Sequence, residues 1–172
     1  MGAAPYPRKR KIPLISGNAD ILIRKATEDD LNSVKTLADA HRRELGFIRR
    51  PTLVEATRRE EIIVALHSER LVGFVHYHHR RDEQTTLYDI VVTPDYRRTG
   101  LGRDLVHALM LESRAQKKQF IVLKCPEELA ANAFYERIGF ERWQEDPGKR
   151  RRLIVWRLAL QNCPTTTDAN HK

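Results

Sequence analysis

The sequence predicts a mixed α/β fold, in which a central sheet of about six to seven strands is flanked by about four helices. Three observations predict it. Segments with strand periodicity and segments with helix periodicity alternate along the chain. Residues 87–125 have the pattern of a strand, a helix and a strand, and such a crossover makes its two strands parallel. Two apolar segments near the C-terminus flank Pro147–Gly148, a turn signal that indicates a hairpin.

The first elements of the chain are a short strand and two helices. The strand is ILIRKA, residues 21–26. Thr27 and Asp30 form a capping-box-like pair at the start of a helix, whose apolar residues recur at helical spacing until Gly46 ends it. A similar cap signature after Pro51 predicts a second, short helix.

The rest of the chain is dominated by strands. Two β-branched, apolar runs, EIIVALH and RLVGFVHYH, meet at Ser68 and Glu69 and predict a hairpin. The segments that follow are a strand at residues 85–93, a helix at 102–116, a strand at 120–125 and a helix at 127–138, which Gly139 ends as a left-handed cap. FERWQ and RLIVWRL form the closing hairpin, which completes the mixed sheet.

Composition favours one compact domain. The chain has 172 residues, of which 41% are hydrophobic and 31% are charged, so it can bury a core without disulfides or metals. We expect a domain at residues 21–160, preceded by a basic flexible tail at 1–20 and followed by a polar tail at 161–172. The two cysteines, Cys125 and Cys163, fit neither a disulfide framework nor a zinc-ligand spacing. The sequence therefore predicts no metal and favours a reducing compartment.

Hydropathy and charge limit the kinds of partner. No apolar run approaches the roughly 18 residues of a membrane span, and no signal-peptide core is found, so we expect a soluble, cytoplasmic protein without a membrane partner. The net charge is +8, and Arg8, Lys9, Arg10 and Lys11 carry half of that excess. We interpret this run as a solvated arm, with a nucleic-acid, membrane-surface or acidic partner as the alternative. A homodimer is left open.

The segment IVVTPDYRRTGLGRDL, residues 90–105, joins a buried strand to the start of a helix. Gly100 and Gly102 let the backbone turn tightly and approach a ligand closely, while the helix N-terminus presents free N–H groups. Nearby arginines favour a diphosphate. The dinucleotide-binding fingerprint needs a third glycine and the P-loop needs Gly-Lys-Ser/Thr, and this segment has neither. The alternative is an ordinary tight turn with solvated arginines.

This segment closely resembles the acyl-CoA-binding motif of the GNAT acetyltransferase superfamily, Val-x-Pro-x-x-Arg-x-x-Gly-x-Gly/Ala. Every motif position is matched, by Val92, Pro94, Arg97, Gly100 and Gly102. ELAANAFYERIGF further along the chain is similar to the family's second motif, a helix with Asn and Tyr before a terminal Gly-Phe. The resemblance covers about one domain, roughly residues 21–160, and implies the GNAT fold.

The resemblance implies acetyl-CoA as co-substrate. A strand edge would pair with the pantetheine arm, the loop would hold the pyrophosphate, and two helix residues would face the pantetheine and the thioester sulfur. The residues implied in cofactor binding are Ile90, Val91, Val92, Arg97, Arg98, Thr99, Gly100, Leu101, Gly102, Arg103, Asn132 and Tyr135.

The implied chemistry is direct acetyl transfer to an amine, which needs a base for the ammonium and a proton donor for the departing sulfur. Tyr135 is the predicted general acid, with structural packing as its alternative role. His76, His78 and Asp89 are candidate bases, and the two histidines share one strand face by period two. For Cys125 we expect a structural thiol rather than a nucleophile, because no activating base is evident.

The acceptor is not identified by the sequence. Arg42, Arg43, Arg49 and Arg50 lie between the first two helices and would bind an anionic small molecule or protein, or form solvated surface charge. Leu123 stands where ribosomal-protein N-terminal acetyltransferases usually carry a glutamate, which argues against that branch. Two other functions are kept as alternatives, a non-catalytic acyl-CoA-binding module and a basic domain that contacts nucleic acid.

Overall fold

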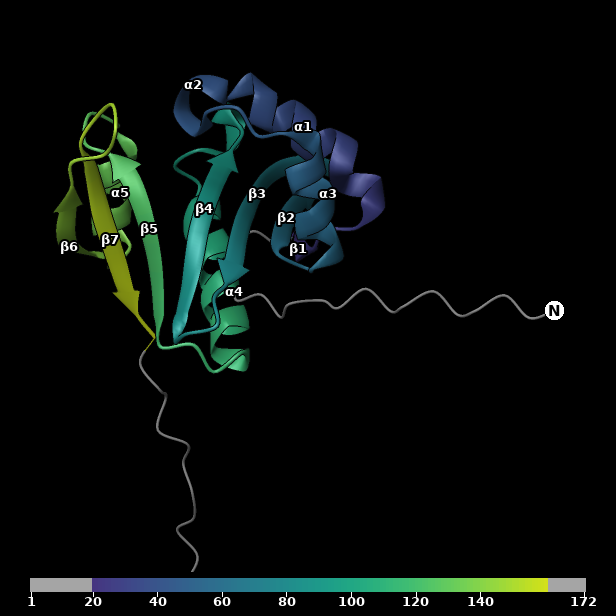
Figure 1. Cartoon of the computed structure of the whole chain (residues 1–172). Coiled ribbons are helices and arrows are strands. Elements are labelled where there is room, and N and C mark those ends of the chain that lie inside the picture. The colour runs from purple at the N-terminus through teal and green to yellow at the C-terminus, as the bar shows by residue number, and fades with distance from the viewer. Residues whose placement is uncertain (1–19, 161–172) are drawn as a thin grey trace, which may run out of the picture.

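The computed structural model describes residues 20–160, which form a single seven-stranded sheet and five α-helices (Figure 1). The strands are β1 (Ile21–Lys25), β2 (Ile62–His67), β3 (Arg70–His79), β4 (Gln84–Val92), β5 (Phe120–Pro126), β6 (Glu141–Asp146) and β7 (Leu153–Ala159). The helices are α1 (Leu31–Ala40), α2 (Arg42–Leu45), α3 (Arg50–Arg58), α4 (Leu101–Ala115) and α5 (Ala131–Arg137). Short 3₁₀ turns precede α1, at Glu28–Asp30, and α4, at Pro94–Tyr96.

The strand order is β1-β2-β3-β4-β5-β7-β6. All neighbouring strands are antiparallel except β4 and β5, which the crossover through α4 makes parallel. The predicted mixed sheet is therefore confirmed. The predicted hairpin between β2 and β3 is also confirmed, because Ser68 and Glu69 both have positive φ, at 47° and 68°, as a tight hairpin turn requires.

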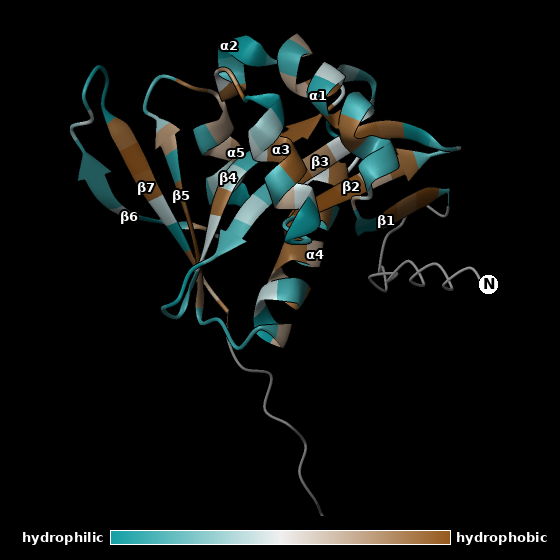
Figure 2. Cartoon of the chain, turned by 45° about the vertical axis from the view of Figure 1, so that its right-hand side comes forward, coloured by the Kyte–Doolittle hydropathy of each residue, from teal (hydrophilic) through white to brown (hydrophobic). Residues whose placement is uncertain are grey.

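Two hydrophobic cores lie on opposite faces of the sheet. One core joins α4 and α5 to the sheet through residues such as Leu105, Leu109 and Tyr135. The other joins α1 and α3 to β2 and β3, through Val34, Leu53 and Phe74. Figure 2 shows β2 and β7 as largely hydrophobic, whereas the edge strand β6 is hydrophilic, in agreement with its exposure. No helix between residues 20 and 160 is long and apolar enough to span a membrane.

Strands β4 and β5 are paired only at one end. Three residue pairs join them, from Gln84–Phe120 to Thr86–Val122, and beyond these the two strands separate (Figure 1). On its other side β4 pairs with β3 along its whole length, with one irregularity: His76 is opposite Asp89 and Tyr77 is opposite Leu87. Tyr88 is thus the extra residue of a β-bulge. The second half of β4 has a free backbone edge towards β5.

Charged groups are also buried between β1, β3 and α4. Nζ of Lys25 lies 2.8 Å from Oε1 of Glu112 and donates to the Glu60 carbonyl, also at 2.8 Å. It donates to the hydroxyl of Tyr77 as well. His79, whose Nε2 lies 3.9 Å from Oε1 of Glu112, and Lys25 together lower the pKa of Glu112 to about 2. This cluster lies on the α4 face of the sheet.

Three predicted helix boundaries were wrong. The helix expected to end at Gly46 is interrupted at His41, between α1 and α2. The helix expected after Pro51 begins before that proline, with Arg49 as its N-cap. The helix expected at residues 127–138 is shorter, since α5 begins only at Ala131. Gly139 does follow α5 with a φ of +98°, as predicted. Most of the two predicted tails lies outside the described residues.

Candidate active site

The turn between β4 and α4 has the geometry of an anion site. Gly100 is the N-cap of the 15-residue helix α4 and has a φ of +91°, a conformation that glycine adopts without strain. The N–H of Asp104 donates to the Gly100 carbonyl at 3.0 Å. The preceding amides, of Leu101, Gly102 and Arg103, therefore have no acceptor within the helix. Free amides and the positive end of the helix dipole favour a bound anion such as a phosphate.

The side chains of this turn have different partners. Nη2 of Arg103 lies 3.6 Å from the position that a Cβ on Gly100 would take, so its guanidinium lies over the turn. Arg98 is exposed. Thr99 uses its hydroxyl within the turn, where it donates to the Tyr96 carbonyl at 2.6 Å. Arg98 and Arg103 are thus the arginines of the turn best placed to add charge for a phosphate.

Arg97 and Gly102, both predicted to contact the cofactor, also have contacts within the protein. Nε of Arg97 donates to the Val92 carbonyl at 3.2 Å, and its Nη2 lies 3.5 Å from Oε2 of Glu44, so Arg97 joins β4 to α2. A Cβ on Gly102 would lie 3.1 Å from the ring of Phe134. Gly102 therefore permits α4 and α5 to pack closely, in addition to its predicted role beside the cofactor.

The free edge of β4 exposes backbone hydrogen-bonding groups. The N–H of Thr93 donates to the Val72 carbonyl at 2.9 Å, so by the alternation of an antiparallel pair Val91 also bonds β3. Ile90 and Val92 then direct their N–H and C=O groups to the other side, where β5 has already separated. Arg97 occupies the Val92 carbonyl. The edge has room for an extended ligand with amide groups, because unpaired backbone groups there need partners.

Both ends of the Asn132 side chain bond to the protein, and its expected cofactor contact stays a prediction. Its Nδ2 donates to the carbonyls of Pro126 at 2.8 Å and Leu129 at 2.9 Å, and lies 3.2 Å from that of Glu127. Its Oδ1 accepts a 2.8 Å hydrogen bond from Nε1 of Trp156. Asn132 thus fixes the loop between β5 and α5 to β7, which gives its amide a structural role.

Tyr135 is buried on α5, with 8% of its surface exposed. Its ring packs edge-on against Phe134 and Phe140, with centroid distances of 5.5 and 5.8 Å. Burial raises the pKa of Tyr135, and the charges of Cys125 and Asp89 raise it further. The hydroxyl is therefore protonated at neutral pH.

A cavity of about 640 Å³ lies on the opposite face of the sheet, between α3 and the strands β3 and β4. Its lining contains two histidine–carboxylate pairs, of which His78 is the most exposed member, at 36%. Nδ1 of His76 lies 2.9 Å from Oδ2 of Asp89, and these side chains are 9% and 11% exposed. Nδ1 of His78 lies 2.7 Å from Oε1 of Glu61, which is also 11% exposed. The structure brings the three predicted bases together, and the histidines do share one strand face.

These pairs determine which nitrogen carries the proton. An ionised carboxylate only accepts hydrogen bonds, so Nδ1 of each histidine is the donor. In a neutral imidazole Nε2 is then the acceptor and can take a proton. Asp89 would stabilise the resulting imidazolium of His76. The pair has the arrangement of a base with an orienting carboxylate.

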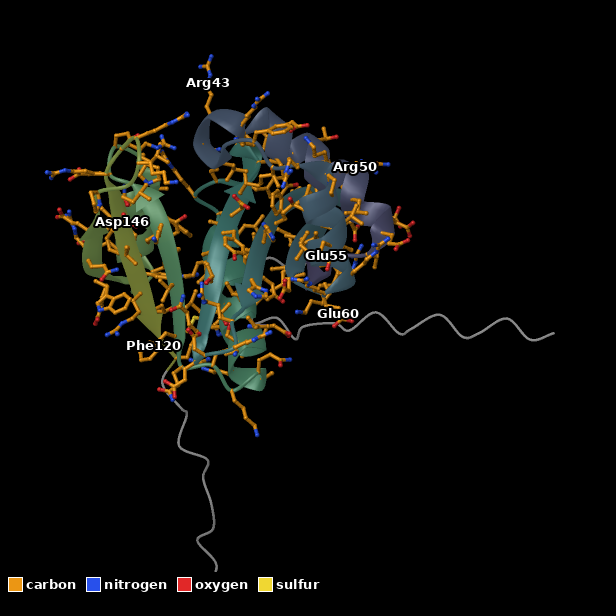
Figure 3. The ribbon with its side chains drawn as sticks, viewed as in Figure 1. Arg43, Arg50, Glu55, Glu60, Phe120 and Asp146 are labelled. Atoms are coloured by element: carbon orange, nitrogen blue, oxygen red, sulfur yellow. The ribbon has the colours of Figure 1, made fainter. Side chains whose placement is uncertain are left out.

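The four predicted arginines do not act as one cluster. Arg49 lines the cavity. The guanidinium of Arg42 instead lies 4.7 Å from the ring centre of Phe47. Arg43 and Arg50 point away from the protein body in Figure 3 and do not line the cavity.

Sequence analysis missed several lining residues. They are Phe47, Ile48, Thr52, Glu55, Ala56, Arg59 and Glu61. Most of them belong to α3 or to the residues that flank it, and no sequence motif marks them. They line the cavity because α3 packs beside β3, the strand that carries His76 and His78. Glu61 was detectable in part, because counting back through the β2–β3 hairpin places it near His76.

Two further expectations were that Cys125 is not a nucleophile and that the protein binds no metal; the structure bears on them only within the described residues. Cys125 is 4% exposed, and burial raises the pKa of its thiol to about 11, so little nucleophilic thiolate forms at neutral pH. Cys163 lies outside the described range. Within residues 20–160 no group of three or more His, Cys, Asp or Glu side chains is arranged to hold a metal ion.

Comparison with known proteins gives a consistent family. The family model described as "Acetyltransferase (GNAT) domain" matches residues 58–142. An uncharacterized N-acetyltransferase, ycf52, from Porphyra purpurea is 27% identical over 128 residues, which cover 70% of each chain.

Solved structures share the fold. Ard1 from Thermoplasma volcanium superposes with a TM-score of 0.75 at 19% identity, over 84% of this chain and 100% of that one. The PaiA N-acetyltransferase from Thermoplasma acidophilum, solved in complex with coenzyme A, gives a TM-score of 0.68 at 15% identity, over 81% and 98%. The family match and the N-acetyltransferase relative support a GNAT acetyltransferase, and the solved structures show that the chain has the GNAT fold.

Proposed function

We propose that the protein transfers an acetyl group from acetyl-CoA to a primary amine bound in the cavity. The observation that carries this proposal is the position of two features on consecutive residues of β4. Ile90 presents free backbone groups at the edge towards β5, and Asp89 holds His76 at the cavity on the other face. A thioester held along that edge and an amine in the cavity would meet at the bulge of β4.

The chain's own residues fit the co-substrate. The α4 amides with Arg98 and Arg103 would hold the pyrophosphate, and the edge groups of Ile90 and Val92 would pair with the pantetheine amides. Bound acetyl-CoA supplies an activated thioester carbonyl. The coenzyme A complex of the PaiA acetyltransferase, which has the same fold, supports this assignment.

Two proton transfers accompany the reaction. Nε2 of His76 takes the proton of the ammonium, so that the neutral amine forms the new N–C bond as the C–S bond breaks. Tyr135, whose raised pKa keeps it protonated, would donate to the departing sulfur. The amine nitrogen's second proton would pass through water to the tyrosinate so formed, and His76 would release the first proton to solvent. Asp89 orients His76 through its hydrogen bond at Nδ1.

A thiol-release assay over a panel of amines tests this function. Asp89→Asn and His76→Gln should each lower kcat by about a hundredfold or more, with coenzyme A affinity by calorimetry unchanged. Asp39→Asn, which alters an exposed carboxylate on α1, is the matched control. Coenzyme A binding without turnover of any amine would contradict the enzyme assignment and favour a binding module.

A further inference from the structure

The charged residues of the cavity differ in sign between its buried and exposed parts. We call the lining residues His76, Asp89 and Glu61, whose side chains are 9–11% exposed, the floor, and the exposed lining residue Arg49 the rim cation. The floor holds two carboxylates whose side chains are each only 11% exposed. The rim cation precedes α3, where Arg49 is the N-cap residue. One end of the cavity thus attracts cations and the other attracts anions.

The remaining charges of the lining largely cancel. Nη2 of Arg59 lies 2.9 Å from Oε1 of Glu55, one turn earlier on α3, so these two side chains form an ion pair. Arg49 is different, since the ion pairs formed between residues 20 and 160 do not include it. Its guanidinium is the cavity charge that lacks a counter-ion within the described chain.

From this division we infer that the acceptor is a small zwitterion, an amine that also carries a carboxylate. This inference rests on the proposed acetyltransferase function and names its substrate class. The ammonium would lie at the floor beside Asp89 and Glu61 until His76 removes its proton. The carboxylate would accept paired hydrogen bonds from Arg49, a geometry that guanidinium matches well.

Other acceptor classes fit the charge pattern less well. A diamine would place its second ammonium beside Arg49, and like charges in a partly enclosed site repel each other. A simple alkylamine would leave Arg49 without a counter-ion. The cavity volume of about 640 Å³ lies in the range of small-molecule sites.

The experiment compares three acceptors that share one carbon-chain length: γ-aminobutyrate, n-butylamine and putrescine. Thiol release is measured with saturating acetyl-CoA, and β-alanine and ε-aminocaproate extend the amino-acid series to find the span between floor and rim. For the best chain length we expect kcat/KM of the amino acid to exceed that of the matching alkylamine about tenfold or more.

Substitutions of Arg49 test whether this residue causes the preference for the amino acid. Arg49→Gln should remove the preference for the amino acid over the alkylamine, and Arg49→Glu should reverse it in favour of the diamine. Arg58→Gln, an exposed arginine at the end of the same helix that does not line the cavity, should leave the ratio unchanged. Thermal unfolding checks that each variant is folded, and acetyl-CoA KM should stay constant.

The possible results distinguish a failure of the zwitterionic-acceptor inference from a failure of the proposed acetyltransferase function. Equal turnover of all three acceptors, or a preference that survives Arg49→Gln, would overturn the zwitterion while leaving the acetyltransferase intact. Coenzyme A binding without turnover of any amine would overturn both.

Discussion

Replacing Asn132 by alanine should destabilise the fold without weakening coenzyme A binding by the folded protein. The indole N–H of Trp156, a residue only 5% exposed, would lose its acceptor, and an unsatisfied buried donor costs about 1–3 kcal/mol. The carbonyls of Pro126 and Leu129 would also lose their donor, although water can replace part of it. We expect a total loss of roughly 2–4 kcal/mol in the free energy of unfolding.

For a domain of this size such a loss corresponds to a fall in Tm of roughly 5–15 °C. Calorimetry and denaturant titration measure it, and a double-mutant cycle with Trp156→Phe isolates the bond between the two side chains, for which we expect about 1 kcal/mol of coupling. Asn132→Asp is the matched control, because it retains an oxygen for Trp156 but presents a second acceptor to the loop carbonyls. It should be destabilised as well.

The alternative is a residue that binds the cofactor, as the family resemblance implied. In that case Asn132→Ala would keep wild-type stability and lose coenzyme A affinity. That result would refute the assignment of Asn132 as a structural residue.

Three further predictions concern groups on the α4 and α5 face. Tyr135→Phe keeps the ring and removes only the hydroxyl, so kcat should fall about a hundredfold with coenzyme A affinity unchanged, and a near wild-type kcat would show that water protonates the sulfur. Glu112 has a pKa of about 2 in the fold, below its usual 4.5, so its stabilising contribution is complete above about pH 4.5 and is lost as the pH falls towards 2. The stability difference between the wild type and Glu112→Gln should narrow in that window, and a constant difference would contradict it. Gly102→Ala would place a Cβ 3.1 Å from the ring of Phe134 and should cost roughly 1–3 kcal/mol of stability, whereas unchanged stability with weaker coenzyme A binding would favour a ligand-contact role.

The fold was predictable where the sequence is regular. The crossover around α4 and the β2–β3 hairpin follow from periodicity and turn residues, and the structure has both. The errors fall at irregular positions. The break at His41 has no glycine or proline to mark it. Residues 127–130 have helix-favouring composition, yet Asn132 takes up nearby carbonyls with its side chain, and such side-chain bonds compete with helix formation.

The motif located the anion-binding turn but did not identify the partner of each motif residue. A motif gives the residue type at each position. The contacts that each side chain makes depend on helices and strands that are distant in the sequence. Arg97 contacts Glu44 of α2, and Gly102 lies against Phe134 of α5. Neither neighbour is part of the turn, so the turn sequence alone assigned both residues to the cofactor.

Glu61 shows why one of the three floor residues was not found from the sequence. Strand alternation would place Glu61 on the same face as Ile63 and Ala65, which belong to the core beneath α4. Glu61 precedes β2, however, and follows Glu60, whose φ of +57° turns the chain there. Its carboxylate reaches His78 on the α3 face, so the rule that correctly paired His76 with His78 fails one residue outside the strand. The hairpin register therefore places Glu61 near His76, but the face of the sheet that its carboxylate reaches is decided by the turn at Glu60, where strand alternation does not apply.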